Sequence, residues 1–337
     1  MTKRVFVSQY VYPDVVDELR AAGYEVVART DDRPLPAQEL REAVRDADAL
    51  VCFLTDRIDA ELFAAGPRLE VVANVAVGYD NVDVAAASAA RVAVTNTPGV
   101  LTAATADLAM ALILATARRV PEGDAYLRAG RYTHWKLDQD QIGADVTGQR
   151  LGIFGFGQIG RAVAKRALHG FDMNVVYHDA YRLPDEDEQA LGVRYAELDE
   201  LLETSDFVSV HAPLLPGTRH AIDAAALARM KRTAILVNTA RGPIVDEAAL
   251  ADALADGTIA GAGLDVYEEE PAVHPRLLEQ RERVVLLPHL GSATTSTRRH
   301  MAAIAVGNVI DALAGVRPRT LVNDEVLTPD TSLRTGS

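Results

Sequence analysis

Three residues whose side chains can bind an acid and move a proton follow successive predicted strands in the second half of the chain: Arg241, Glu270 and His289. The strands predicted before them are, in the same order, 235–238, 262–265 and 284–287. Because the carboxyl ends of parallel strands meet at one edge of a sheet, we expect a guanidinium, a carboxylate and an imidazole to emerge there together. Taken singly, each could be a surface or loop residue; their joint placement favours a site.

This set of side chains suits one kind of reaction. An arginine holds a substrate carboxylate through two hydrogen bonds and polarises a neighbouring carbonyl. A histidine gives a proton to the carbonyl oxygen as a hydride reaches the carbon, and takes the proton back in the reverse direction. A glutamate beside the histidine fixes its tautomer and favours its protonated form. The set therefore indicates hydride transfer between a nicotinamide cofactor and a 2-keto or 2-hydroxy acid.

A glycine-rich turn, Gly155-Phe156-Gly157-Gln158-Ile159-Gly160, stands between a predicted strand and a predicted helix. In such a turn the first glycine permits a tight bend and the second lets the backbone approach a pyrophosphate. The third lets helix and strand pack closely. The helix N-terminus adds N–H groups and a partial positive charge. A glycine turn without a ligand is the alternative, but this context favours a dinucleotide site.

Asp179 lies 19 residues after Gly160, at the end of the second strand of this series. That is the spacing of the acid that binds the ribose in dinucleotide sites. A carboxylate there accepts hydrogen bonds from the ribose hydroxyls and repels a 2′-phosphate, which favours NAD over NADP. Arg182 is close enough in the chain to soften this preference, so NADP stays open as a cofactor. A solvated acid at a strand end is the alternative for Asp179.

Composition excludes several classes of protein. The chain has 337 residues and a formal net charge of −14 without a basic stripe, so nucleic acid is not an expected partner. Its longest apolar run, 108–117, is about half of what a membrane span needs. The single cysteine, Cys52, excludes an internal disulfide and a multi-cysteine zinc site, and no metal is expected. Met1–Arg4 leads into a strand-like run without a signal-peptide pattern, so a reducing cytoplasm is the expected location.

The elements that must position these groups form two βα series. In the first, short β-branched runs alternate with helix-like stretches at 13–22 and 36–46; the strand candidates are 5–8, 24–28, 49–54, 70–74 and 92–95. The second begins at Arg150, and its strand candidates before the three already named are 151–154, 174–177 and 207–210. Alternation at this spacing predicts an α/β protein with parallel sheets.

Other segments connect or follow these series. An apolar, alanine-rich helix is predicted over 102–119, closed by Pro121. Residues 130–148 lack a clean period and hold the only tryptophan, Trp135, so we interpret them as a connecting arm. A last helix is predicted over 294–314, and the tail after Pro329 is predicted to be disordered.

Five stretches together resemble the D-isomer-specific 2-hydroxyacid dehydrogenase family. They are Asn74–Asp83 (NVAVGYDNVD), the turn Gly155–Gly160, Asn238–Gly242 (NTARG), Gly263–Pro271 (GLDVYEEEP) and Pro288–Ser292 (PHLGS). The stretches span most of the chain. Within the family, the chain looks most like the glyoxylate and hydroxypyruvate reductases.

The resemblance implies an architecture of two Rossmann-like or flavodoxin-like parallel-sheet domains. The substrate domain would be discontinuous, over 1–100 and 292–337. The NAD-binding domain, over 101–291, would be inserted into it. A homodimer formed through about 102–149 is implied as well.

The resemblance also implies roles for single residues. Arg241 would bind the substrate, Glu270 would be the partner of the histidine, and His289 would be the acid and base. Backbone N–H groups of Val77 and Gly78 would receive the substrate carboxylate.

Further positions match residues that line the cofactor or the substrate pocket. Besides the glycine turn and Asp179, the cofactor set comprises Thr105, His211, Thr239, Ala240 and Asp265. Asp265 would lie near the carboxamide; a loop or helix-cap acid is the alternative. Trp135 would reach the active site of a partner subunit; an anchor in the core of its own chain is the alternative. Leu54 and Trp135 suggest a small apolar pocket wall, which suits glyoxylate or hydroxypyruvate.

Other activities related to this family stay as alternatives. D-lactate dehydrogenase is open, whereas regulated phosphoglycerate dehydrogenases usually append a further domain and this chain stops at Ser337. Phosphite-oxidising relatives have a lysine where this chain has Val77. A non-catalytic, NADH-sensing corepressor would keep the same three residues, but no basic or extended recruiting segment supports it. Formate dehydrogenase relatives use glutamine where this chain has Glu270.

Overall fold

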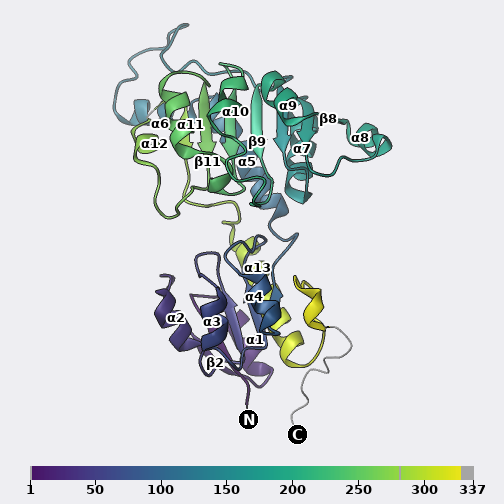
Figure 1. Ribbon diagram of the computed structural model, residues 1–337. Coiled ribbons are helices and arrows are strands. Elements are labelled where there is room, and N and C mark those ends of the chain that lie inside the picture. The colour runs from purple at the N-terminus through teal and green to yellow at the C-terminus, as the bar shows by residue number, and fades with distance from the viewer. Residues whose placement is uncertain (1, 281, 328–337) are drawn as a thin grey trace. The chain divides into compact units, whose positions relative to one another are not determined.

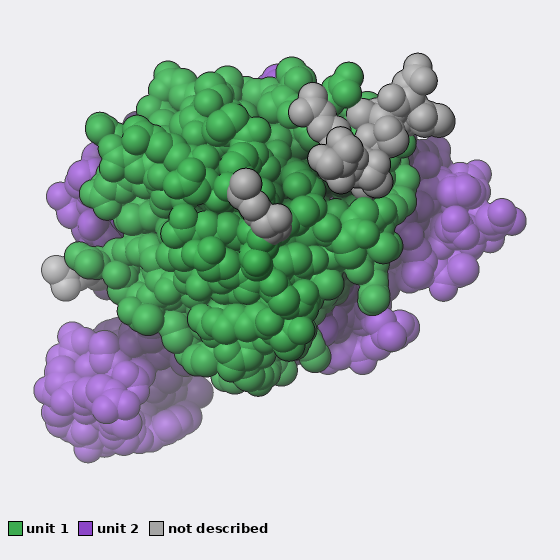
Figure 2. Space-filling model, turned by 90° about the horizontal axis from the view of Figure 1, so that it is seen from below, with its two compact units in different colours: residues 1–101, 294–337 green, residues 102–293 purple. Residues whose placement is uncertain are grey.

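The computed structural model describes residues 2–280 and 282–327, which fall into two compact units. The first unit joins the two ends of the chain, 1–101 and 294–337, and the second is the continuous segment 102–293 (Figure 1). Figure 2 colours the two units separately. In each unit the named strands pair only in parallel, so the predicted α/β class with two parallel sheets is confirmed. The tail after Pro329, predicted to be disordered, lies outside the described residues.

The sheet of the first unit has the strand order β2-β1-β3-β4-β5. This is the flavodoxin-like order, which reverses direction between β1 and β3. The strands are short and mostly apolar, and the inner strands β3 and β4 are buried throughout, as expected for a sheet covered on both faces. They are β1 (Arg4–Val7), β2 (Glu25–Ala28), β3 (Ala49–Cys52), β4 (Val71–Asn74) and β5 (Ala93–Thr95).

Five helices cover this sheet. One face carries α1 (Pro13–Ala21) and α13 (Thr295–Leu313), and the other carries α2 (Ala37–Ala43), α3 (Ala60–Ala65) and α4 (Val84–Ala89). Helix α13 comes from the far end of the chain, and its Val306 and Val309 share a core with Val5 and Val71. The C-terminal segment, which ends in the short 3-10 helix η2 (Asp324–Leu327), therefore completes a core that the first 101 residues leave open.

The sheet of the second unit has the strand order β12-β11-β10-β9-β6-β7-β8. It is the Rossmann order with one further strand, and it reverses between β6 and β9, where such sheets bind ligands. The strands are β6 (Arg150–Phe154), β7 (Asn174–His178), β8 (Val193–Tyr195), β9 (Phe207–Val210), β10 (Ile235–Asn238), β11 (Gly261–Leu264) and β12 (Val284–Leu286).

Two layers of helices enclose the second sheet. One face packs against α5 (Thr102–Ala117) and α7 (Gln158–Phe171). The other packs against α9 (Leu198–Thr204), α10 (Ala224–Arg229), α11 (Glu247–Ala255) and α12 (Pro275–Glu279). Helix α8 (Asp185–Leu191) lies at the outer end of the sheet beside β8 (Figure 1). The elements α6 (Val120–Arg128) and η1 (Gly242–Ile244) lie in connections.

Two elements differ from the sequence-based expectation. Pro121 does not close a helix over 102–119: α5 ends at Ala117, and Pro121 stands in the first turn of α6, where its missing N–H costs no helical hydrogen bond. Arg119, in the left-handed conformation with φ 53°, separates the two helices. The strand β8 was not predicted, because a three-residue edge strand with Arg194 at its centre carries almost no apolar pattern.

The predicted connecting arm has neither helix nor strand over residues 131–149. In the part of the chain that the structure describes, no helix combines the length and the apolar character that crossing a lipid bilayer requires.

Candidate active site

The loops that carry Arg241, Glu270 and His289 follow three neighbouring strands. β10, β11 and β12 are adjacent and parallel in the second sheet. All three residues therefore leave the carboxyl edge of one sheet, as the sequence predicted. The glycine turn follows β6 at the same edge of that sheet.

The side chains of Glu270 and His289 form a hydrogen-bonded pair. His289 Nδ1 lies 2.8 Å from Glu270 Oε2. Since a carboxylate only accepts hydrogen bonds, Nδ1 carries the hydrogen, and Nε2 is the ring nitrogen that can exchange a proton with a ligand. Glu270 Oε1 accepts the backbone N–H of Tyr267 at 3.1 Å, which holds the carboxylate in place. Each side chain is 26% exposed, so the pair is partly desolvated but accessible.

The backbone of His289 is held in a strained turn. Its φ of 53° lies in the left-handed region, which is costly for a residue with a β-carbon. Asp265 stabilises the turn: Oδ1 accepts the N–H of Leu290 at 2.6 Å, and Oδ2 accepts the N–H of Gly291 at 2.8 Å. The carbonyl of Asp265 also accepts the N–H of His289 at 2.9 Å. Burial raises the pKa of Asp265, while the hydrogen bonds from Leu290 and Gly291 favour its charged form.

Thr105 holds the same turn from helix α5. Its Oγ1 donates to the carbonyl of Gly291 at 3.1 Å, and its side chain is buried. Thr105 and Asp265 were both predicted to line the cofactor. In the structure both support the segment that follows His289, as the loop-acid alternative for Asp265 expects. Their roles toward a cofactor stay predictions.

The loop of Arg241 lies directly against the segment that follows β11. Asn238 shapes this loop: its Nδ2 donates to the carbonyl of Arg241 at 2.9 Å, and its Oδ1 accepts the N–H of Ala240 at 3.0 Å. A β-carbon on Gly242 would lie 1.8 Å from the carbonyl carbon of Tyr267. Only glycine permits this approach, which brings the arginine loop against the chain leading to the glutamate.

Sequence reasoning missed Glu247, the first residue of α11. Its buried side chain accepts two backbone N–H groups, from Glu268 to Oε1 at 2.6 Å and from His274 to Oε2 at 3.2 Å. Glu268 Oε1 in turn accepts the N–H of Glu247 at 2.9 Å. These two carboxylates clamp both ends of the segment that carries Glu270. Burial raises the pKa of Glu247. No motif signals this clamp, because an acid in the first turn of a helix is common for other reasons.

The glycines of the turn after β6 serve two purposes. Gly155 has a φ of 94°, and a β-carbon on it would lie 2.2 Å from the backbone nitrogen of Ala212. A β-carbon on Gly160 would lie 2.3 Å from the carbonyl oxygen of Gly155. These two glycines are required by close packing. A β-carbon on Gly157, by contrast, would meet nothing within 4 Å.

The open space at Gly157 fits a phosphate group. Gly157 is the N-cap of α7, and no side chain caps the helix there. Gln158 and Ile159 follow as the first helical residues, so the amide end of α7 faces this space with its partial positive charge. The turn therefore has the room and the donors that the diphosphate of a dinucleotide needs.

Asp179 lies immediately after β7 and is tied to the glycine turn. Its Oδ2 accepts the N–H of Phe156 at 2.6 Å, and its Oδ1 accepts the N–H of Tyr181 at 3.0 Å. Because a carboxylate oxygen has two acceptor directions, both oxygens can still accept a hydrogen bond from a hydroxyl. The structure thus brings the predicted ribose-binding acid and the predicted phosphate-binding turn together.

His211 and Thr239 lie side by side after β9 and β10. His211 Nδ1 is 3.4 Å from Thr239 Oγ1, and its Nε2 is 2.8 Å from Ser209 Oγ. Desolvation lowers the pKa of His211 to about 3, so its imidazole is neutral near pH 7. His211 can therefore offer hydrogen-bonding groups to a ligand, but no positive charge.

Three further predicted substrate residues, Leu54, Val77 and Gly78, lie on the first unit. Leu54 follows β3, and Val77 and Gly78 follow the neighbouring strand β4. The carbonyls of Val77 and Gly78 accept hydrogen bonds from the side chains of Asn96, at 2.8 Å, and Asn74, at 3.0 Å. The structure thus gives this loop a defined backbone, and its role toward a substrate stays a prediction.

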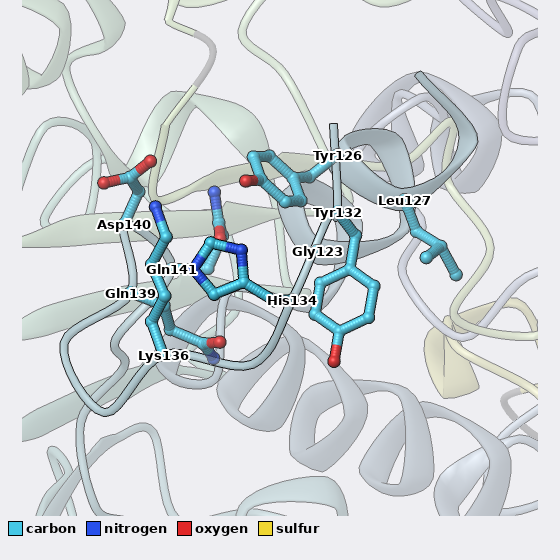
Figure 3. Close-up of a pocket in the computed structure, with 9 residues that line it drawn as sticks. All are labelled: Gly123, Tyr126, Leu127, Tyr132, His134, Lys136, Gln139, Asp140 and Gln141. Atoms are coloured by element: carbon cyan, nitrogen blue, oxygen red, sulfur yellow. The ribbon is translucent and has the colours of Figure 1, made fainter. Parts of the chain in front are cut away.

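Trp135 is not a core anchor of its own chain, because 69% of it is exposed. Figure 3 shows a hollow between α6 and the arm, where Tyr126, Tyr132 and His134 are among the lining residues. The side chain of Leu127 points away from His134 in the same view. Further large apolar side chains that are exposed on α6 and the arm are Val120, Leu137 and Ile142.

Comparisons with known proteins agree with this arrangement. The family model for the D-isomer specific 2-hydroxyacid dehydrogenase, NAD binding domain, matches residues 110–291. A glyoxylate reductase of Korarchaeum cryptofilum is 49% identical over 330 residues, which are 97% of this chain and 98% of that protein.

Two solved structures are similar over nearly the whole chain. A protein from Thermus thermophilus has a TM-score of 0.88 and 44% identity, and the match covers 95% of this chain and 99% of that one. An NADPH-dependent glyoxylate/hydroxypyruvate reductase from Sinorhizobium meliloti, in complex with NADP and malonate, has a TM-score of 0.81 and 34% identity. That match covers 96% of this chain and 98% of the other.

Alanine substitutions at Gly157 and Gly155 should distinguish a glycine that leaves space for a phosphate from one that close packing requires. Gly157→Ala should lower the free energy of unfolding by less than about 1 kcal/mol, since it replaces only an N-cap glycine in open space. It should nevertheless weaken NADH binding by roughly tenfold or more, because its methyl group would keep a phosphate from the helix amides. Gly155→Ala should cost several kcal/mol, because its β-carbon would collide with backbone. Chemical denaturation and NADH fluorescence titration measure both effects; wild-type NADH affinity in Gly157→Ala would show that phosphate binds elsewhere.

Glu247→Gln should loosen the segment that carries Glu270. One of the two accepted N–H groups would face the amide nitrogen of the new side chain, which should cost about 1–3 kcal/mol of stability. Amide hydrogen exchange should accelerate at Glu268 and His274. The matched control is Asp256→Asn, which removes an exposed acid at the C-terminal end of the same helix. If both variants unfold and exchange alike, the clamp does not hold the segment.

Proposed function

The chain belongs to the D-isomer specific 2-hydroxyacid dehydrogenase family, and we propose that it reduces a small 2-keto acid, glyoxylate or hydroxypyruvate, to the 2-hydroxy acid. The observation that carries the proposal is the Glu270–His289 pair, at the same sheet edge as the Arg241 loop and the glycine turn. The names of the Korarchaeum and Sinorhizobium relatives, a glyoxylate reductase and a glyoxylate/hydroxypyruvate reductase, support the substrate class. The chain is an oxidoreductase of this family.

His289 is the proposed acid and base. A bound nicotinamide dinucleotide supplies the hydride for reduction. Nε2 of His289 gives a proton to the carbonyl oxygen of the substrate, so the C=O group becomes CH–OH; in the reverse direction the same atom takes the proton. Glu270 keeps the hydrogen on Nδ1 and stabilises the positive charge of the protonated ring. Arg241 binds the substrate carboxylate and polarises the adjacent carbonyl.

NAD is the cofactor that we propose this chain prefers. The carboxylate of Asp179, fixed by two backbone N–H groups beside the glycine turn, suits free ribose hydroxyls and repels a 2′-phosphate. NADP stays an alternative, since the Sinorhizobium relative is described as an NADPH-dependent reductase.

A homodimer through about 102–149 belongs to the same proposal. Its support is the apolar surface of α6 and the arm, with Trp135 as the side chain expected to reach the partner. A cytoplasmic location is also proposed, because the single cysteine, Cys52, is buried and free.

A spectrophotometric screen at a wavelength of about 340 nm, where reduced nicotinamide absorbs, tests the function. It pairs glyoxylate, hydroxypyruvate and pyruvate with NADH and NADPH, and it pairs phosphoglycerate-type hydroxy acids and phosphite with the oxidised forms. Turnover of glyoxylate or hydroxypyruvate with NADH, above all other pairs, is the expected result. No turnover of any keto acid would overturn the proposed reduction, and no turnover of any pair would favour the corepressor alternative.

His289→Ala should lower kcat by roughly 10²–10⁴-fold, the usual loss when a positioned general acid is removed. NADH affinity should stay close to that of the unchanged protein, because the side chain is paired with Glu270 and not with the glycine turn. Steady-state kinetics and NADH titration measure the two quantities. His169→Ala, which removes an exposed imidazole from α7 in the same unit, is the control. Differences of up to about threefold in kcat lie within the error of such comparisons. A kcat of His289→Ala within that range of the control would therefore contradict the assignment.

Arg241→Ala should raise KM and lower kcat together. The guanidinium both anchors the carboxylate and orients the carbonyl, so its loss affects binding and the reactive geometry. Arg241→Lys keeps the charge but loses the two-pronged hydrogen bonding, and should recover only part of the loss. Kinetics with glyoxylate measure both variants. Unchanged KM and kcat in Arg241→Ala would show that the carboxylate is bound elsewhere.

A further inference from the structure

Arg182 lies three residues after Asp179 and is engaged by helix α8. Its Nε is 2.9 Å from Glu188 Oε1, and its Nη2 is 2.7 Å from Asp185 Oδ1. Its guanidinium carbon also lies 5.5 Å from the centre of the Tyr195 ring, within the range of a cation–π contact. The side chain is still 55% exposed. The cation that follows the predicted ribose acid in the chain is thus bound by two carboxylates of α8.

Glu188 is held in place independently of Arg182. It is 7% exposed and accepts the hydroxyl of Tyr177 at 3.0 Å and the N–H of Tyr195 at 3.3 Å. The hydrogen bond from Arg182, together with these two, lowers the pKa of Glu188 despite some desolvation. Tyr177 is in turn fixed, because its hydroxyl accepts the N–H of Leu183 at 2.8 Å. Glu188 is therefore an anion in a fixed position, and the more exposed side chain of Arg182 binds to it.

The local charge is strongly negative. Between 179 and 188 the chain carries five acids and one arginine, and four of those acids form the first turn of α8. A 2′-phosphate on the ribose would need a cation that can bind it through two hydrogen bonds. Arg182 already gives two of its five N–H groups to Glu188 and Asp185, and these two carboxylates offset its positive charge, so a 2′-phosphate would meet a largely neutralised cation.

We propose that Asp185 and Glu188 sequester Arg182 and thereby make α8 a specificity element that disfavours dinucleotides with a 2′-phosphate. The inference rests on the proposed function, because it concerns the same dinucleotide site. It goes beyond the effect of Asp179, since it assigns discrimination to two residues that do not touch the ribose-binding acid in the structure. Release of Arg182 should convert it into a phosphate ligand.

The test compares 2′,5′-ADP, which has a phosphate on the 2′ oxygen, with 5′-ADP, whose second phosphate instead extends a 5′-diphosphate, by isothermal titration calorimetry without substrate. In the double variant Asp185→Asn/Glu188→Gln, the affinity for 2′,5′-ADP should rise about tenfold, the order expected when a guanidinium gains a charge-assisted contact to a phosphate. The affinity for 5′-ADP should stay within about twofold. Adding Arg182→Gln to this variant should abolish the gain, because the gain requires the released guanidinium.

The matched control is Asp199→Asn/Glu203→Gln. It also removes two negative charges from the second unit and frees an arginine, Arg229, which these two acids contact at 3.4 and 3.2 Å. This control should leave the ratio of the two affinities unchanged. An equal gain in the control would show that net charge alone decides the ratio, and would overturn the proposal.

Arg182→Gln in the otherwise unchanged chain keeps the test valid if the double variant folds poorly. A sequestered arginine contributes nothing to a 2′-phosphate, so the affinity for 2′,5′-ADP should not fall. A tenfold loss would show that Arg182 already serves the phosphate, and the proposal would be wrong. If the unchanged protein binds neither 5′-ADP nor NADH, the proposed function fails; if it binds both but the double variant shows no gain, only this inference fails.

Discussion

Carboxylates that accept backbone N–H groups hold the loops at the carboxyl edge of the seven-stranded sheet. Asp265 accepts two such groups from the turn after β12, Glu247 two from the segment after β11, and Asp179 two around the glycine turn. Loops carry many polar backbone groups, and a desolvated N–H without a partner is costly. A carboxylate can accept hydrogen bonds from two backbone N–H groups, and these bonds are stronger than those to a neutral acceptor. It can therefore hold a loop that has no regular secondary structure.

This arrangement explains how the strained turn at His289 persists. Its left-handed φ disfavours folding locally, and the buried Asp265 offsets that cost by binding the two N–H groups that follow. The same device holds Glu270 through the clamp of Glu247 and Glu268. Glu270 and His289 therefore meet at 2.8 Å although they come from different loops, since Glu247 holds the first loop and Asp265, at the start of that loop, holds the second.

Sequence reasoning anticipated the site where it depended on the order of elements. Parallel strands in sequence place their following loops on one edge, so Arg241, Glu270 and His289 could be assigned together before any geometry was known. The glycine turn and Asp179 were found for the same reason, because their spacing reflects a strand, a helix and a second strand. Trp135 was left between two interpretations, since its exposure depends on what the arm packs against and no periodicity reports that.

The amino-acid sequence by itself determined the α/β class, the elements and the residue types available for chemistry, because hydrophobic periodicity and turn residues are local properties. Only the tertiary structure decided which polar groups meet. Glu247 reaches Glu268 and His274 across loops, Asp265 turns toward Leu290 and Gly291, and Arg182 binds α8 instead of pointing freely at a ribose. Such contacts join residues that no spacing rule connects, since hydrogen bonds depend on positions within a few tenths of an ångström that the packing of the whole unit sets.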